Sequence, residues 1–156
     1  IRKSSRIIMK IEDIKKLRQE TGAGMADCKE ALKESGGDME KAKDYLNKIG
    51  FEKGDSKGDR EVKAGIIDVY SHGGKVGVLI ELLCETDFVA RTADFKNLAH
   101  ELSLQIASMN PSSVEELLAQ EYIRDATQTI DQLIKSVSGK LGENIQVGRF
   151  ERIGPK

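Results

Sequence analysis

The chain has 156 residues, which suffices for one ordinary domain or for a small module joined to a modest core, and which excludes two full-sized domains. Its 25 basic and 26 acidic side chains nearly cancel and form no long run of one sign, so we expect a protein partner and no direct nucleic-acid or anionic-membrane surface. No apolar stretch reaches the roughly 20 residues that a membrane-spanning helix requires.

The chain opens with the basic and apolar stretch 1–8, which precedes Met9. Since Met9 is predicted to begin a patterned helix, we interpret residues 1–8 as a tag or processing remnant, and the remains of an organellar targeting segment would have the same composition. Cys28 and Cys84 lack CxxC spacing and lie in apolar stripes, which favours free thiols. The predicted location is therefore a reducing compartment of the bacterial cytoplasmic type, with an organelle as the alternative.

Residues 9–51 are predicted to form an N-terminal module of three short helices. Apolar residues recur with helical spacing in three stretches, separated by the turns 21–24 and 35–38. Asp38 is placed to cap the third helix. Each stripe needs the other two for burial. The stripes are Ile11, Ile14 and Leu17, then Met25, Cys28 and Leu32, then Ala42, Leu46 and Ile49.

Residues 52–64 are predicted to be a charged linker. Positions 52–63 carry eight charges of mixed sign, two glycines and one apolar side chain, Val62. Such a composition cannot stabilise burial, so we expect this segment to stay solvated and the modules on either side of it to swing.

Residues 65–156 are predicted to form a small α+β core of a dimerisation type. Two β-rich runs, 66–70 and 76–84, flank the turn 72–75 and predict a β-hairpin. Helical spacing follows over 95–109, where Asn110-Pro111 ends it, and over 130–141, where Gly142 ends it. Residues 144–153 alternate like a strand. Together these elements predict a three-stranded antiparallel sheet packed by helices.

No catalytic constellation is visible in the sequence. His72 lies in the predicted hairpin turn and His100 on a helix, without partners at metal-ligand spacing, so both are interpreted as ordinary surface residues. The glycine-rich stretches 21–24 and 72–75 lack the GK[ST] ending of a phosphate loop. We therefore predict no metal and no cofactor, and an enzyme is the least favoured class.

The segment 21–32 is one of two that invite a functional interpretation. On pattern alone it is a corner between two helices, with Met25 in the core. The alternative is a contact surface of the N-terminal module.

The segment 84–91 is the second segment that invites a functional interpretation. On pattern alone, Thr86 or Asp87 caps a helix and Phe88 staples that helix to the core. However, an aromatic side chain directly after an acid in so short a connection also suits an anchor for a partner's pocket.

Three stretches of the chain stand out together by their order and spacing. They are Leu17-Arg18-Gln19-Glu20-Thr21-Gly22-Ala23-Gly24-Met25 with Asp27-Cys28-Lys29, then Glu85-Thr86-Asp87-Phe88-Val89-Ala90-Arg91, then Gly142-Glu143-Asn144-Ile145 with Arg149-Phe150. At these residues the chain resembles the elongation factor Ts family, and the resemblance extends from Met9 to Phe150. It implies an N-terminal module similar to ubiquitin-associated domains, followed by a core with an antiparallel sheet.

The function that this resemblance implies is guanine-nucleotide exchange on elongation factor Tu, a translational GTPase, during protein synthesis. In that family the residues matching Arg18, Met25 and Lys29 grip the GTPase domain. The loop matching Thr86, Asp87, Phe88 and Val89 inserts near the Mg²⁺ and phosphate site, with Phe88 as the wedge and Asp87 beside it. Because Mg²⁺ demands near-ideal octahedral geometry, displacing its surroundings weakens GDP binding without any covalent step.

The chain departs from the family pattern in three places. Ala26 stands where the family usually has a second methionine, and the segment 52–64 lacks the usual Ala- and Lys-rich helical character. Only one core unit is present where longer members have two, which suggests a homodimer through the core sheet. Two alternatives stay open: an adaptor with a ubiquitin-associated-like module, and a ribosome-associated binding module, both without exchange activity.

Overall fold

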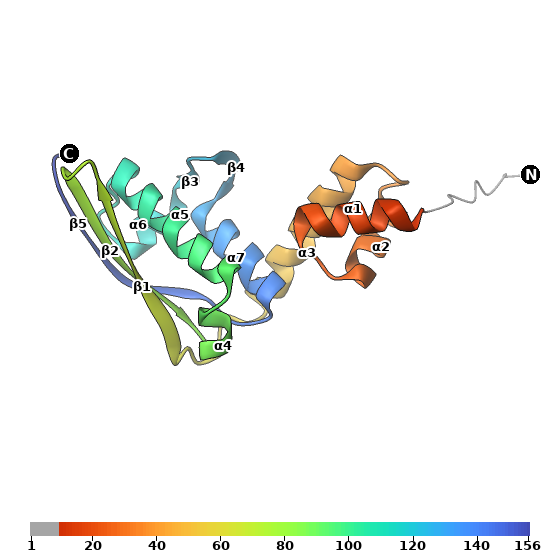
Figure 1. The fold of residues 1–156 in the computed structure, drawn as a ribbon, viewed down its shortest axis with the longest axis horizontal. Helices are drawn as coiled ribbons and strands as arrows, with labels where there is room; N and C mark the ends of the chain where they lie inside the picture. The colour runs from red at the N-terminus through yellow and green to blue at the C-terminus, as the bar shows by residue number, and fades with distance from the viewer. Residues whose placement is uncertain (1–9) are drawn as a thin grey trace, which may run out of the picture. The chain divides into compact units, whose positions relative to one another are not determined.

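The computed structural model describes residues 10–156, so the interpretation of residues 1–8 and the helix start predicted at Met9 lie outside the described part of the chain. The chain divides into two compact units between Gly50 and Phe51. Figure 1 shows the helices and strands of each unit in chain order.

The first unit contains three helices, as the sequence predicts: α1 (Ile11–Thr21), α2 (Met25–Glu34) and the beginning of α3 (Met39–Asp55). The N–H of Gly22, in the left-handed region, closes α1 on the carbonyl of Arg18. Asp38 accepts a hydrogen bond of 3.0 Å from the N–H of Lys41, which confirms the predicted cap of α3. The buried residues are Ile14, Leu17, Cys28, Ala31, Leu32, Ala42 and Leu46.

The segment 52–63 does not stay solvated throughout, so that expectation is wrong. Its first residues complete α3, and the carboxylate of Asp55 lies 3.0 Å from Nζ of Lys135. Nδ2 of Asn144 donates to the carbonyls of Gly58, at 3.3 Å, and Arg60, at 2.6 Å. The composition of the segment could not predict this packing, because the contacting residues Lys135 and Asn144 are remote in the sequence.

The second unit is built on a three-stranded antiparallel sheet in the order β1-β2-β5. The strands are β1 (Ala64–His72), β2 (Val76–Cys84) and β5 (Gln146–Ile153), which confirms the predicted hairpin and third strand. The hairpin turn places Gly73 and Gly74 at φ of 57° and 70°, a region open to glycine. In the register, Leu79 of β2 stands between Val69 and Glu151.

Helices cover one face of this sheet, as Figure 1 shows, which confirms the predicted α+β class. They are α4 (Asp87–Ala90), α5 (Ala93–Met109), α6 (Val114–Ala119) and α7 (Ile130–Leu141). Alternate residues of β2 enter the core because successive side chains of a strand point to opposite faces. The largest buried members of this core include Ile80, Leu82, Phe95, Leu102, Ile106, Leu117 and Ile130.

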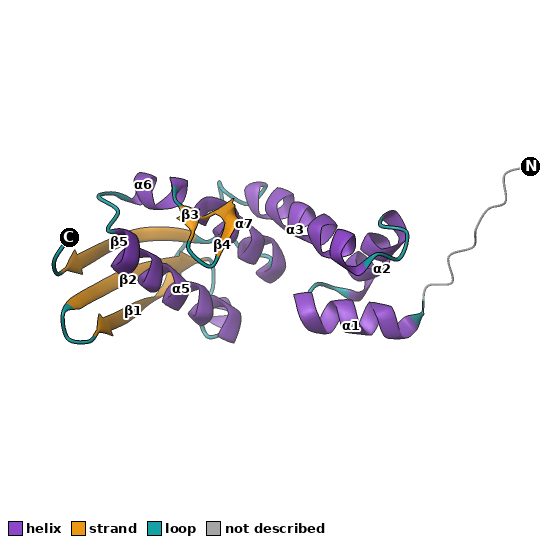
Figure 2. Cartoon of the chain, turned by 90° about the horizontal axis from the view of Figure 1, so that it is seen from above, coloured by secondary structure: helices purple, strands orange, loops and turns teal. Residues whose placement is uncertain are grey.

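A small second sheet, β3 (Glu121–Tyr122) with β4 (Asp125–Thr129), was not predicted; Figure 2 shows it beside the helices. It is tied to α5 by the buried side chain of Gln105, which donates to the Glu121 carbonyl at 3.0 Å and accepts from the Ile123 N–H at 3.0 Å. Strands this short have no readable alternation. Over residues 10–156, every helix lacks the combination of length and apolar character needed to cross a membrane.

Candidate functional site

The connection from β2 to α5 contains the short helix α4, which begins directly after Thr86. Thr86 has extended backbone angles, and its Oγ1 accepts a hydrogen bond of 3.4 Å from the N–H of Val89. The predicted helix cap is therefore Thr86, and Asp87 occupies the first turn.

Phe88 points away from the core and is 81% exposed. The interpretation of Phe88 as a staple to the core is wrong, because the next two residues, Val89 and Ala90, are the buried ones. Successive residues of a helix differ by about 100° around its axis, so a single turn that buries these two directs Phe88 outward. Leaving a phenylalanine in water forgoes about 1.5–3 kcal/mol of burial free energy. An exposed aromatic on a short helix is well suited to enter a partner's pocket.

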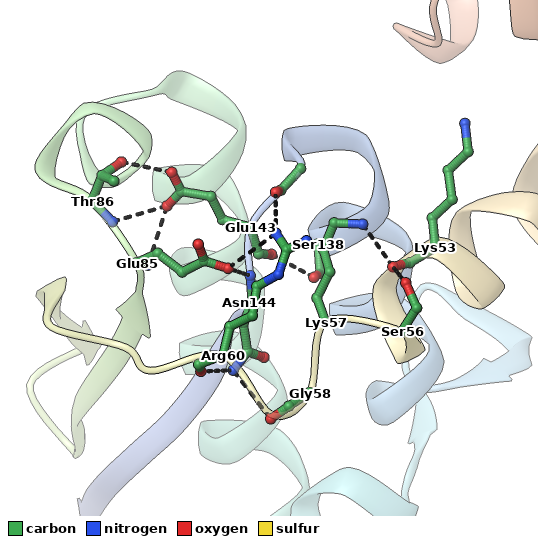
Figure 3. A network of polar contacts seen from close by, with 11 residues as sticks. Lys53, Ser56, Lys57, Gly58, Arg60, Glu85, Thr86, Ser138, Glu143 and Asn144 are labelled. Atoms are coloured by element: carbon green, nitrogen blue, oxygen red, sulfur yellow. Dashed lines mark hydrogen bonds and ion pairs between the residues drawn. The ribbon is translucent and has the colours of Figure 1, made fainter.

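The carboxylate of Glu143 holds the start of this helix. Its Oε1 accepts hydrogen bonds from the N–H groups of Glu85, at 3.1 Å, and Thr86, at 2.9 Å. Its Oε2 accepts from the Thr86 hydroxyl at 2.7 Å. Figure 3 shows Glu143 directed at these donors. Three donors on one carboxylate fix the backbone that leads into α4.

A second carboxylate, that of Glu85, reaches in the opposite direction. It accepts a hydrogen bond of 2.8 Å from the N–H of Asn144 and lies 3.6 Å from Nη1 of Arg60. Glu85 and Glu143 therefore join the end of β2 to the loop before β5 in both directions, as Figure 3 shows.

Cys84 lies immediately below this loop and is completely buried. Its Sγ donates to the carbonyl of Thr86 at 3.2 Å. Burial raises the pKa of the Cys84 thiol, and the negative charge of Glu143 raises it further. The thiol is therefore protonated at neutral pH and acts as a packing group, as the sequence predicts for a free cysteine.

The residues singled out in the N-terminal module are all exposed. Met25 is the first residue of α2 and is 40% exposed, so the interpretation that places it in the core is wrong. It lies at the end of the apolar stripe, one turn before the buried Cys28. Met25 and Lys29 are four residues apart and so share one face of α2, while Arg18 lies near the end of α1.

Both histidines occupy exposed positions, as predicted. The hydroxyl of Tyr70 lies 2.8 Å from Nδ1 of His72, and Nδ1 of His100 lies 3.8 Å from Oδ2 of Asp68. Within residues 10–156, no group of three or more His, Cys, Asp or Glu residues is arranged to hold a metal ion.

Comparison with known proteins places these features in a family. Residues 85–155, which contain α4 together with Glu85 and Glu143, match the family described as Elongation factor TS. The chain is 42% identical over 185 residues to the elongation factor Ts of Coprothermobacter proteolyticus, a match that covers 89% of this chain and 94% of that protein. The chain belongs to the elongation factor Ts family. It is also 54% identical over 138 residues to the elongation factor Ts of Nostoc sp. (strain PCC 7120), covering 88% of this chain.

The lengths of these elongation factor Ts relatives differ. The chain spans 44% of the Nostoc sp. protein and 43% of the Nostoc punctiforme protein, but 91% of that from Thermoanaerobacter sp. (strain X514), to which it is 38% identical.

The sequence did not assign a role to Glu143 or Asn144. The stretch Gly142–Ile145 is one of the three that resemble the family, and this resemblance was the only available signal. Glu143 and Thr86 are 57 residues apart, so spacing could not reveal their contact.

Proposed function

We propose that this chain is a guanine-nucleotide exchange factor for elongation factor Tu, which promotes GDP release during protein synthesis in a bacterial type of cytoplasm. The observation that carries the proposal is Phe88, which stands 81% exposed on a short helix whose start is held by Glu143. Membership of the elongation factor Ts family supports the choice of partner.

The proposed mechanism is mechanical and involves no covalent step. Phe88 enters the GTPase near its Mg²⁺ and phosphate site, and Asp87, beside it in the first turn of α4, perturbs the surroundings of the ion. Since Mg²⁺ tolerates little distortion of its octahedral shell, such a wedge weakens GDP binding. By linkage GDP weakens the grip of the factor equally, and each tenfold of coupling corresponds to about 1.4 kcal/mol.

The N-terminal module is proposed to supply a separate grip through Arg18, Met25 and Lys29. The first and last offer positive charge, and Met25 offers a flexible apolar side chain, 40% exposed, that adapts to a partner's surface. This division of labour assigns affinity mainly to the module and release mainly to α4.

The sheet is proposed to support a homodimer through the face that the helices leave uncovered. Val69 and Leu79 stand opposite each other in the β1–β2 register, and both are exposed. Ile67 and Ile153 add further exposed apolar surface, and Ile153 is 78% exposed. Four exposed aliphatic side chains on one small sheet favour burial against an identical sheet, because a two-fold interface uses the same patch twice.

A GDP-release assay tests the exchange function. The wild-type chain is expected to accelerate the release of labelled GDP from elongation factor Tu, and Asp87→Ala combined with Phe88→Ala is expected to lower the maximal acceleration about tenfold or more, as truncating an anchor residue does. Met109→Ala is a matched control, because Met109 is a large apolar side chain exposed at the far end of α5. A wild-type chain that leaves GDP release unchanged would refute the proposal.

A further inference from the structure

The loop between α7 and β5 contains Gly142-Glu143-Asn144-Ile145, a stretch that the proposed mechanism does not bring into contact with the GTPase. Two of its residues point at other segments of the second unit: Glu143 at residues 85–86 and Asn144 at residues 58–60. Figure 3 shows both sets of contacts converging on this loop.

We propose that Glu143 and Asn144 are positioning residues for the exchange helix α4. This inference rests on the proposed exchange function. Neither residue needs to touch the GTPase. Glu143 fixes the backbone from which Phe88 projects. Asn144 fixes the carboxylate of Glu85 and the chain segment 58–60.

The contact through Glu143 continues into the helix itself. The Thr86 hydroxyl donates its hydrogen to Glu143 and at the same time accepts from the N–H of Val89, so one oxygen joins the carboxylate to the first turn of α4. Hydrogen bonds to an ionised acceptor are roughly twice as strong as neutral ones, which makes a carboxylate an effective holder of this turn. Phe88 lies between the two residues that this chain of bonds connects.

Asn144 extends the same assembly to the segment that follows α3. Asn144 is only 3% exposed, and its side-chain amide donates to the carbonyls of Gly58 and Arg60. Its backbone N–H donates to Glu85, whose own N–H donates to Glu143. Consecutive residues of one loop thereby hold two segments that are remote in the sequence.

Support for α4 determines what fraction of the molecules holds Phe88 in the orientation that can enter the GTPase. If α4 loses its support, the fraction of molecules that present Phe88 correctly falls, and the rate of GDP release at saturating factor falls with it. The grip assigned to Arg18, Met25 and Lys29 does not depend on this loop. The positioning role therefore predicts a lower maximal rate with little change in the concentration that gives half of it.

The test compares Glu143→Ala and Glu143→Gln with the matched control Glu116→Ala. Glu116 accepts from the N–H and the hydroxyl of Ser112, so it makes the same kind of contact at α6, away from the exchange helix. In Glu143→Ala, hydrogen exchange at the amides of Glu85 and Thr86 is expected to accelerate by about tenfold or more, and the maximal rate of GDP release to fall by about fivefold or more. Glu143→Gln, which keeps neutral hydrogen bonds, is expected to lie between Glu143→Ala and wild type in both measurements.

Three results decide the matter. A Glu143→Ala protein that folds and retains the wild-type maximal rate overturns the positioning role, as does one whose loss appears only as a raised half-saturating concentration. An equal loss in Glu116→Ala also overturns it. If Glu143→Ala fails to fold, Glu143→Gln carries the same comparison. A wild-type chain without exchange activity refutes the proposed function instead. Even then, unchanged hydrogen exchange at the Thr86 amide in both Glu143→Gln and Glu143→Ala would overturn the positioning role of Glu143.

Discussion

Thr86 donates two hydrogen bonds to Glu143: its N–H to Oε1 at 2.9 Å and its hydroxyl to Oε2 at 2.7 Å. This pair fixes the start of α4, and among the side chains that the structure describes in the second unit, Phe88 on this helix is the large aromatic that stands almost free in water. A rigid support beneath an exposed anchor lowers the entropy that the anchor loses on binding. The predictions below follow from this arrangement and from the packing around it.

Phe88→Ala is expected to leave stability almost unchanged. Because Phe88 is exposed, the free energy of unfolding should change by no more than about 0.5 kcal/mol, whereas Phe95→Ala, at a fully buried position of α5, should cost about 3–5 kcal/mol. Denaturant unfolding of both variants provides the measurement. A large loss of stability in Phe88→Ala would show that Phe88 packs against the core and would contradict its exposed position.

Gly54→Ala is expected to destabilise the second unit. An added Cβ at Gly54 would lie 2.0 Å from the carbonyl oxygen of Lys135, a collision with backbone that costs about 1–3 kcal/mol. The same change in an open helical position stabilises by about 0.5–1 kcal/mol, so the sign of the effect is diagnostic. Thermal unfolding checks it, with Gly77→Ala as the control because a Cβ at Gly77 meets nothing within 4 Å. A stabilised Gly54→Ala would contradict the packing of this segment on α7.

Cys84 is expected to resist alkylation in the native protein. Burial raises the pKa of its thiol above the ordinary value, so the reactive thiolate is scarce at pH 8 and increases as the pH rises. Iodoacetamide labelling followed by mass spectrometry should be slower in the native state than in denaturant by about tenfold or more, since reaction requires local opening. Equal labelling rates in the two states would show that the loop above Cys84 opens freely.

The pair of Lys43 and Glu20 is expected to make the first unit sensitive to pH at both extremes. The hydrogen bond with Glu20 raises the pKa of Lys43 to about 12, and the same contact lowers the pKa of Glu20. The stability that charged Lys43 contributes is therefore fully present at pH values below the ordinary pKa of lysine, and it is lost as the pH rises through 12. The stability that charged Glu20 contributes is present above the ordinary pKa of glutamate and is lost as the pH falls through its lowered pKa. Circular dichroism across pH, compared with Lys43→Met, measures both; identical profiles would contradict the linkage.

Val69→Lys is expected to disrupt the proposed homodimer. The charge would enter the uncovered face of the sheet opposite Leu79, where pairing with a second copy would desolvate it. Light scattering should show a fall from twice the chain mass to the chain mass, with no such change for Ala119→Lys at an exposed position of α6. A wild-type chain that is monomeric at all concentrations would rule out this interface.

The sequence predicted what is periodic and local. Alternation identified the hairpin and the third strand, and the spacing of Leu98, Leu102 and Ile106 identified α5, because burial on one face imposes those periods. Pattern alone placed Phe88 and Met25 in the core, since apolar residues near helix starts resemble core residues until the neighbouring positions are seen to fill the core. The alternative interpretation of Phe88, as an anchor for a partner's pocket, agrees with its exposure. It could not predict the contacts of Asn144 with Gly58 and Arg60, which depend on how remote segments meet.

The separation of Thr86 from Glu143 also sets the order in which the protein becomes competent as it is synthesised. Residues 84–91 leave the ribosome well before residues 142–153, and contacts of long sequence separation form late because the intervening loop must first close. The turn that carries Phe88 therefore gains its support only after Glu143 has been synthesised and has reached Thr86. A nascent chain that stops short of Glu143 has the aromatic residue but not the carboxylate that holds its helix in place.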